Sequence, residues 1–285
     1  MSVVVTGATG HLGRLVVESL LERGYPAAEV TATGRSIEKL ADLAERGVTV
    51  RRADFGDRAS LREAFEGADT VLLVSGSELG KRVEQHRNAV EAAKEVGVGH
   101  LVYTSAPRAS DTTLILAPEH KATEEILAAS GLNHTILRNG WYSELYGQTL
   151  EQARAHGFFV GSAGQGRIAS ASRVDLAEAA AVVLADPVPH DGTVLELTGD
   201  TAWTNDELAG YLSEILGREV AYRDLSSDEH RAALLAAGLD AGLADFLVGV
   251  DGNIRDGELS HTTSSLSELL GRPTTPVTET LRRLA

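Results

Sequence analysis

The sequence contains no cysteine and one methionine, and aromatic residues make up only 5% of its 285 positions. Without cysteine there are no disulfide bonds, no thiolate metal ligands and no cysteine nucleophile. Long hydrophobic runs are also missing, since none approaches the roughly 18 residues that a membrane-spanning helix needs. No signal peptide is visible, so we expect a protein without a membrane span that resides in the cytoplasm.

Positive charge is scarce as well, because 26 lysines and arginines stand against 41 aspartates and glutamates, for a net charge of −15. This balance argues against a nucleic-acid partner, whose phosphates demand a basic face. The nine histidines are scattered without the spacing of metal ligands, so no metal is predicted. A basic side chain is therefore informative wherever an anionic ligand is expected.

A glycine-rich turn near the N-terminus is the most informative feature that is present. It follows an apolar run at residues 3–5 and precedes an amphipathic stretch at residues 12–21. A strand, a glycine turn and a helix in this order form a phosphate cradle, because glycine lets a ligand approach the backbone and the helix start offers free amides. A tight turn without a ligand is the alternative. The expected dinucleotide-binding residues of this glycine turn are Gly7, Ala8, Thr9, Gly10, His11, Leu12 and Gly13.

The first half of the chain alternates short β-branched runs with helical patterns. Strands are predicted at residues 3–6, 30–33, 48–51, 70–74, 101–104 and 134–137, and helices at 12–23, 37–46, 58–65, 82–96 and 122–129. Helical crossovers between strands mean parallel pairing. The predicted fold class is therefore α/β, a doubly wound parallel (Rossmann) sheet with a smaller, mainly helical C-terminal part on the substrate side.

The same pattern predicts the domain organisation. Residues 1–138 are expected to form the NADP-binding Rossmann domain, with sheet and helix contributions from about 150–200. Residues 139–149 and 201–285 are expected to form a smaller domain on the substrate side, so that the substrate lies in a cleft between the two.

Helix starts are predicted in the C-terminal part from two kinds of signal. Thr204 with Glu207, and Ser265 with Glu268, have the spacing of a capping box. Pro276 is placed to begin a further helix.

The residue that follows the second predicted strand indicates which dinucleotide binds. NAD-binding proteins place an acidic residue there, whereas this chain has Arg35, with Lys39 one helical turn further on. A guanidinium binds a 2′-phosphate through two hydrogen bonds. We therefore predict NADPH, bound by Arg35 and Lys39; a solvated surface arginine is the alternative.

Residues after the later strands complete the expected cofactor site, because ligands lie at the carboxyl ends of parallel strands. Asp54 and Phe55 are placed to flank the adenine. A second group, next to the adenosine half and the nicotinamide, consists of Ser75, Gly76, Ser77, Thr104 and Ser105. Ordinary loop and turn chemistry is the alternative for each of them.

The proton donor of carbonyl reductases is missing from the sequence. Those enzymes use a tyrosine with a lysine four residues later, and none of the six tyrosines here has one. A quinone accepts hydride without a strong acid, because its phenolate product has a conjugate acid with a pKa of about 10 that water can supply. Trp141 and Tyr142 are predicted to wall a flat slot for such an acceptor; packing between domains is the alternative. His120, with Glu124 one turn further on, is a candidate for a proton role, unless the pair forms a solvated helix face.

Six motifs extend over nearly the whole chain: the glycine turn and residues 85–88 (QHRN), 103–105 (YTS), 137–144 (LRNGWYSE), 168–171 (IASA) and 199–204 (GDTAWT). Together they resemble the NmrA-like, atypical short-chain dehydrogenase/reductase family, and within it the bacterial NAD(P)H:quinone oxidoreductase type. The resemblance implies two-electron reduction of quinones by NADPH without the tyrosine–lysine pair. It also implies that NADPH contacts Asn139, Gly140, Trp141, Tyr142, Ser143 and Glu144.

Two residues depart from the family pattern, and two other functions stay open. His11 stands where a glutamine is common, which bears on contacts to the phosphates or nicotinamide, and Leu145 stands where an asparagine is expected in the acceptor slot. The chain could instead be an NADP(H)-sensing regulator without turnover, because fold alone does not settle function. It could also reduce another electron-poor acceptor, such as a triarylmethane dye. A homodimer is possible.

Overall fold

The computed structural model describes residues 1–78 and 80–285. The main sheet of this described part has seven parallel strands in the order β3-β2-β1-β4-β5-β6-β8. In chain order the strands are β1 (Val3–Val5), β2 (Val30–Gly34), β3 (Thr49–Arg52), β4 (Thr70–Leu73), β5 (His100–Ser105), β6 (Asn133–Asn139) and β8 (Val194–Leu197). The predicted doubly wound parallel sheet is confirmed.

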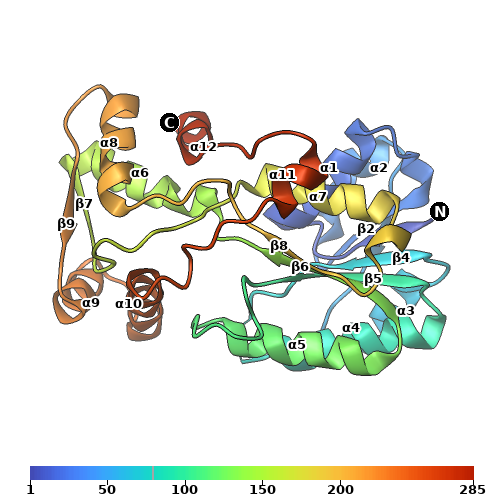
Figure 1. Cartoon of the computed structure of the whole chain (residues 1–285). Coiled ribbons are helices and arrows are strands. Elements are labelled where there is room, and N and C mark those ends of the chain that lie inside the picture. Colours follow the sequence, from blue (N-terminus) through green and yellow to red (C-terminus); the bar gives the residue numbers. More distant parts are fainter. Residues whose placement is uncertain (79) are drawn as a thin grey trace.

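Helices cover both faces of the sheet (Figure 1). One face carries α1 (His11–Glu22), α2 (Ala41–Glu45), α7 (Arg173–Ala185) and α11 (Ser265–Leu270), and the other carries α3 (Arg58–Phe65), α4 (Arg82–Val96) and α5 (Ala117–Ser130). Strand β1 shows how the sequence builds both cores, because successive side chains point to opposite faces. Val3 and Val5 join the core under α1 and α7, whereas Val4 joins the core under α3 and α4.

Helix starts in the C-terminal part match the predictions at two positions and differ at a third. Thr204 and Glu207 form the complete capping box of α8 (Asn205–Leu216), and Pro276 directly precedes α12 (Val277–Leu284). The predicted capping box at Ser265 is wrong, because α11 begins at that residue. The hydroxyl of the preceding serine, Ser264, donates a hydrogen bond to Glu268 Oε1 at 2.6 Å. Among the helices of the described chain, none is long and apolar enough to cross a bilayer.

A small lobe lies at the end of the molecule away from the N-terminus (Figure 1). It consists of α8 and α12 together with α6 (Gly147–His156), α9 (Ser227–Ala236), α10 (Ala241–Arg255) and a parallel pair of strands, β7 (Phe158–Gly161) and β9 (Ala221–Asp224). Phe159, Trp203 and Leu208 belong to its hydrophobic core. The lobe is mainly helical as predicted, and the strand pair was not predicted. A domain division at residue 138 stays a prediction.

Short 3₁₀ helices connect the larger elements. They are η1 (Ala27–Glu29), η2 (Ile37–Leu40), η3 (Ser143–Tyr146) and η4 (Val188–His190). Two of them bear on the site below, because η2 follows Arg35 and η3 contains part of the segment at residues 139–144.

Candidate cofactor-binding site

A cavity of about 410 Å³ (the large cavity) opens at the carboxyl ends of β1, β2 and β4. Strand β1 lies between the other two, so the cavity is at the point where the winding of the sheet reverses, which is where doubly wound folds bind ligands. The predicted cofactor residues that line it are Gly7, Thr9, Gly10, His11, Leu12, Gly13, Arg35, Asp54, Phe55, Ser75, Gly76, Ser77 and Tyr142.

The glycine turn requires glycine at two positions, for its backbone conformation at Gly7 and for its close packing at Gly13. Gly7 has a φ of 62°, in the left-handed region that favours glycine. A Cβ atom on Gly13 would lie 2.5 Å from the carbonyl oxygen of Gly7. Ala8 is fully buried, and its amide donates to the Thr33 carbonyl at 2.8 Å, which ties the turn to β2. The backbone of the turn is therefore fixed where it borders the cavity, which Thr9, His11 and Leu12 line as well.

Helix α1 begins at His11, where no side chain of the described residues caps it, and its first turn has no acidic residue. Asp57, Ser172 and Thr204, in contrast, cap α3, α7 and α8 through hydrogen bonds to backbone amides. The first amides of a helix have no partner within it, and the dipole makes this end positive. The start of α1 can therefore bind an anion at the cavity.

The two basic residues predicted to bind the 2′-phosphate differ in whether they line the cavity. Arg35 lines the cavity, and its Nη1 atom lies 3.0 Å from Glu78 Oε1, which lines the cavity too. Lys39 lies in η2 outside the cavity lining, and its backbone carbonyl accepts a hydrogen bond from Arg14. Of the two predicted basic residues, Arg35 is thus the one that lines this cavity.

The loop after β4, residues 74–78 (the β4 loop), forms the wall beside the glycine turn. The backbone amides of residues 74, 75 and 76 donate to Thr6 Oγ1, Thr104 Oγ1 and His86 Nε2 at 3.0, 2.9 and 2.9 Å. Thr104 is buried, so it supports this wall from behind and is outside the cavity lining.

Trp141 and Tyr142 were predicted to wall one slot, but the structure places them at different cavities. Tyr142 lines the large cavity, where the guanidinium of Arg173 lies 4.7 Å from the centre of its ring. Burial raises the pKa of Tyr142, so its phenol stays protonated. Trp141 lines a much smaller cavity of about 10 Å³ together with Arg108 and Glu196.

The other residues of the segment at 139–144 are outside the lining of the large cavity. Gly140 donates its amide to the carbonyl at the end of β8 at 2.7 Å. Ser143 donates to a neighbouring buried serine hydroxyl at 2.9 Å, and Glu144 Oε1 accepts from the amide of Arg173 at 2.8 Å. Asn139 is buried, and its Oδ1 atom has no hydrogen-bond partner among the described residues. The segment therefore holds Tyr142 and Arg173 in place.

Arg173 lines the cavity and was not among the predicted site residues. It is the first residue of α7. A basic side chain in the first turn of a helix is unfavourable with the helix dipole, and this signal is visible in the sequence. Gln85, from the motif at residues 85–88, lines the cavity as well.

His120 and Glu124 are buried and belong to two separate contacts. The Nδ1 atom of His120 lies 2.7 Å from the Tyr103 hydroxyl, and burial lowers the pKa of His120 to about 3. Glu124 forms an ion pair with Arg138 at 2.7 Å and accepts a hydrogen bond from Ser105 Oγ at 2.6 Å. Neither side chain forms a solvated face, and both, like Ser105, are outside the lining of the large cavity.

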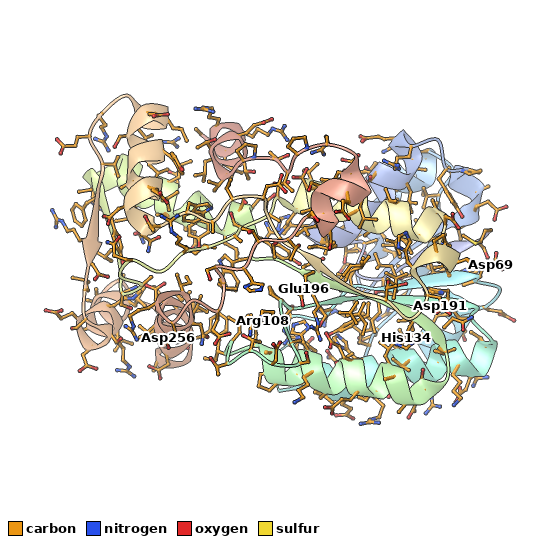
Figure 2. The ribbon with its side chains drawn as sticks, in the orientation of Figure 1. Asp69, Arg108, His134, Asp191, Glu196 and Asp256 are labelled. Atoms are coloured by element: carbon orange, nitrogen blue, oxygen red, sulfur yellow. The ribbon has the colours of Figure 1, made fainter. Side chains whose placement is uncertain are left out.

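Ion pairs continue from Arg138 toward the small lobe. Arg138 Nη1 lies 2.9 Å from Glu196 Oε1, and both carboxylate oxygens of Glu196 accept from the amide of Arg108 at 3.2 and 3.1 Å. Figure 2 shows Arg108 and Glu196, a residue of β8, near the middle of the molecule. Glu258, which follows α10 in the chain, accepts a hydrogen bond from Thr112 Oγ1 at 2.5 Å. These contacts fix the small lobe against the sheet.

Comparison with known proteins assigns this architecture to a family. The model of the NAD(P)H-binding family matches residues 7–187, from the glycine turn to the end of α7 and just beyond. The chain therefore belongs to the NAD(P)H-binding family.

Individual relatives span the whole chain. It is 46% identical over 282 residues to quinone oxidoreductase 2 of Escherichia coli K12, across 99% of this chain and 98% of that one. The crystal structure of the NADPH-dependent quinone oxidoreductase of E. coli complexed with NADPH has a TM-score of 0.95 at 46% identity, covering 99% of each chain. An NmrA-like family domain-containing oxidoreductase of Aspergillus flavus is 30% identical over 305 residues, across 100% of this chain and 95% of that one.

A further solved structure is the Citrobacter triphenylmethane reductase complexed with NADP(H), with a TM-score of 0.95, 36% identity and full coverage of both chains. The predicted resemblance to NmrA-like oxidoreductases is confirmed by these matches.

Proposed function

We propose that the protein is an NADPH-dependent reductase that transfers a hydride to quinones. The observation that carries the proposal is the cavity at the reversal of the sheet, where an uncapped helix start meets a close-packed glycine turn and Arg35. The full-length similarity to quinone oxidoreductase 2 supports the choice of acceptor. The absent tyrosine–lysine pair supports it too, because a quinone needs no strong acid.

The residues of the cavity fit a phosphorylated dinucleotide. A Cβ atom on Gly13 would fill the space beside Gly7, and Thr33, which is among the lining residues, has a buried hydroxyl without a hydrogen-bond partner among the described residues. We assign the pyrophosphate to the first amides of α1 and the 2′-phosphate to Arg35. Asp54 and Phe55 are assigned to the adenine. Bound NADPH supplies the hydride.

The chain has mainly to position the acceptor and exclude water from it. Tyr142 and Arg173 close one side of the cavity, and the ring contact between them holds both side chains. The product of hydride transfer to a quinone is a phenolate with a conjugate acid of pKa about 10, which water protonates. The mechanism therefore requires no proton from His120 or Tyr103, which hydrogen-bond to each other in the core.

The remaining predicted site residues have supporting positions in this proposal. Thr104 holds the β4 loop, and Glu144 holds the start of α7. Reduction of a triarylmethane dye is a second candidate activity, favoured by the 36% identity to the Citrobacter reductase. Residence in the cytoplasm and a homodimer extend the proposal, and size-exclusion chromatography with light scattering tests the dimer.

The test is oxidation of NADPH and of NADH with 1,4-benzoquinone, menadione or a triarylmethane dye as acceptor. Quinone-dependent NADPH oxidation supports the proposal, whereas NADPH binding without turnover of any acceptor identifies a sensor. Arg35→Ala is expected to raise the KM for NADPH at least about tenfold and to leave the KM for NADH unchanged, because a charge-assisted contact to the 2′-phosphate is lost. Arg46→Ala, at an exposed arginine outside the cavity lining, is the matched control.

A further inference from the structure

The β4 loop is held by side chains that come from other parts of the chain. Two of the three acceptors of its amides are threonine hydroxyls, and the third is the Nε2 atom of His86 in α4. A hydroxyl always has lone pairs to offer, but a neutral imidazole accepts on one nitrogen and donates from the other. The third contact therefore depends on which nitrogen of His86 carries the proton.

Thr123 of α5 determines the position of that proton. Its hydroxyl donates to the Glu119 carbonyl at 2.9 Å, so toward His86 Nδ1, at 3.0 Å, it can only accept. His86 must then carry its proton on Nδ1, which leaves Nε2 free to accept from the amide of Gly76. His86 and Thr123 are both fully buried, and burial lowers the pKa of His86 to about 3, so the ring stays neutral.

The carbonyl of Gly76 is fixed by the same two helices. It accepts from Arg82 Nε at 2.7 Å, and Arg82 Nη1 lies 2.8 Å from Glu119 Oε2. Both polar backbone groups of Gly76 are thus bound by side chains of α4. A side chain on Gly76 would lie 3.2 Å from Gln85 Oε1, so the loop is also pressed against α4.

We propose that His86, held in its Nδ1–H tautomer by Thr123, is a positioning residue that sets the shape of the β4 loop for cofactor binding. The inference rests on the proposed function, because it takes the large cavity as the NADPH site. It assigns a role to the motif at residues 85–88 and to a threonine outside the cavity lining.

Removal of the Thr123 hydroxyl has a specific consequence. In Thr123→Val, the proton on Nδ1 loses its buried acceptor, and the ring favours the other tautomer. A proton on Nε2 then faces the amide of Gly76, and two donors repel each other at a distance of 2.9 Å. The β4 loop is displaced although the hydroxyl of residue 123 bonds to His86 and Glu119 and not to the loop, among the described residues.

The experiment compares four full-length proteins by titration with NADPH and by steady-state kinetics with menadione. They are the wild type, Thr123→Val, Thr123→Ser and Thr135→Val. Thr135 is the matched control, because it is also fully buried, accepts from His100 Nε2 at 2.9 Å and donates to the His190 carbonyl at 2.8 Å. Its histidine lies at the start of β5, at the amino end of the sheet.

Thr123→Val is expected to raise both the Kd and the KM for NADPH about tenfold, the cost of one unsatisfied buried hydrogen bond, with kcat at saturating NADPH unchanged. Thr123→Ser restores the affinity, and Thr135→Val keeps it in spite of a similar loss of thermal stability. Equal NADPH affinity in Thr123→Val and the wild type overturns the inference. A wild type that does not bind NADPH overturns the proposed function instead.

Nuclear magnetic resonance of ring ¹⁵N-labelled wild-type protein tests the tautomer without any variant. A proton on Nδ1 of His86 supports the inference, and a proton on Nε2 overturns it. This measurement stays decisive if Thr123→Val does not fold.

Discussion

The glycine turn and the β4 loop are neighbouring walls of one cavity, and they are held in different ways. The glycine turn is held by the left-handed backbone of Gly7 and by the close contact between Gly7 and Gly13. Both features involve residues that are close together in the sequence. In the β4 loop, the amides are bound by side chains of Thr6, Thr104 and His86. The first wall thus depends on local backbone geometry, and the second depends on the tertiary structure.

This difference determines how each wall responds to a change. A substitution in the glycine turn acts at the site of the change, because the missing side chain is itself the structural requirement. A substitution behind the β4 loop acts at a distance, through a buried hydrogen bond whose partner is left unsatisfied. Three experiments test the contrast.

The largest effect is expected from Gly13→Ala. Its Cβ atom would lie 2.5 Å from the Gly7 carbonyl oxygen and 2.9 Å from the amide nitrogen of Ala8, and backbone atoms cannot move aside alone. We expect NADPH affinity to fall at least about a hundredfold and the free energy of unfolding to fall by about 1–3 kcal/mol. Fluorescence titration and urea denaturation measure the two quantities.

The matched control is Gly210→Ala, at an exposed glycine within α8 that has no atom within 4 Å of an added Cβ. It should bind NADPH like the wild type and be about 0.5–1 kcal/mol more stable, because alanine favours a helix. Full NADPH binding by Gly13→Ala would show that the close contact does not shape this wall.

The second experiment varies pH, because two buried histidines resist protonation in the folded chain. His86 packs against the ring of Tyr103 and His120 bonds to its hydroxyl, and burial lowers the pKa of each histidine from 6.5 to about 3. Below pH 6.5 the unfolded chain binds protons that the folded chain does not. Stability is therefore fully present above pH 6.5 and falls as the pH drops toward 3, by about 1.4 kcal/mol per pH unit for each histidine.

Urea denaturation of the wild type and of His120→Gln between pH 6 and 5 measures this effect. The variant lacks one of the two histidines, so the stability difference between the two proteins should narrow by about 1 kcal/mol over this range. A stability difference that stays constant over this range would mean that His120 has the same pKa in the folded and the unfolded chain.

The smallest effect is expected from Glu78→Gln, which changes the charge where the β4 loop meets Arg35. Glu78 pairs with Arg35 at 3.0 Å, and because Arg35 is exposed and Glu78 partly exposed, the pair contributes little to stability. Its carboxylate nevertheless competes with a 2′-phosphate for the guanidinium. We expect two- to fivefold tighter NADPH binding at low salt (roughly 0.4–1 kcal/mol), less at high salt, and unchanged NADH binding.

Glu84→Gln serves as the control for this charge effect, because Glu84 is an exposed glutamate of α4 outside the cavity lining. Isothermal titration calorimetry of the wild type and of both variants measures the affinities for NADPH and for NADH. Equal gains for NADPH and NADH in Glu78→Gln would show that the carboxylate does not act through the 2′-phosphate.

Much of the fold could be predicted because its signals are local. Short β-branched runs between amphipathic stretches require parallel strands with helical crossovers, and the boundaries of α3 and α4 agree with the predicted ranges 58–65 and 82–96. The strand pair β7 and β9 was missed, because its partners are distant in the sequence. The predicted cap at Ser265 failed, because the preceding serine bonds to the same glutamate.

The candidate site was predicted only in part, because some of its features depend on residues that are distant in the sequence. The common slot for Trp141 and Tyr142 was not found, since adjacent residues of an extended chain point to opposite sides and so face different cavities. Arg173 reaches the cavity because α7 begins beside Tyr142. Nothing in the local pattern around residue 173 specifies that neighbour.

The amino-acid sequence by itself determined the glycine turn, the order of strands and helices, and the arginine after β2, because each depends on residues close together in the chain. The tertiary structure decided the β4 loop, the position of Arg173 and the burial of His86 and His120. These features depend on contacts between residues such as Gly76, His86 and Thr123. A hydrogen bond between such groups is specified only when folding brings α4 and α5 against the sheet.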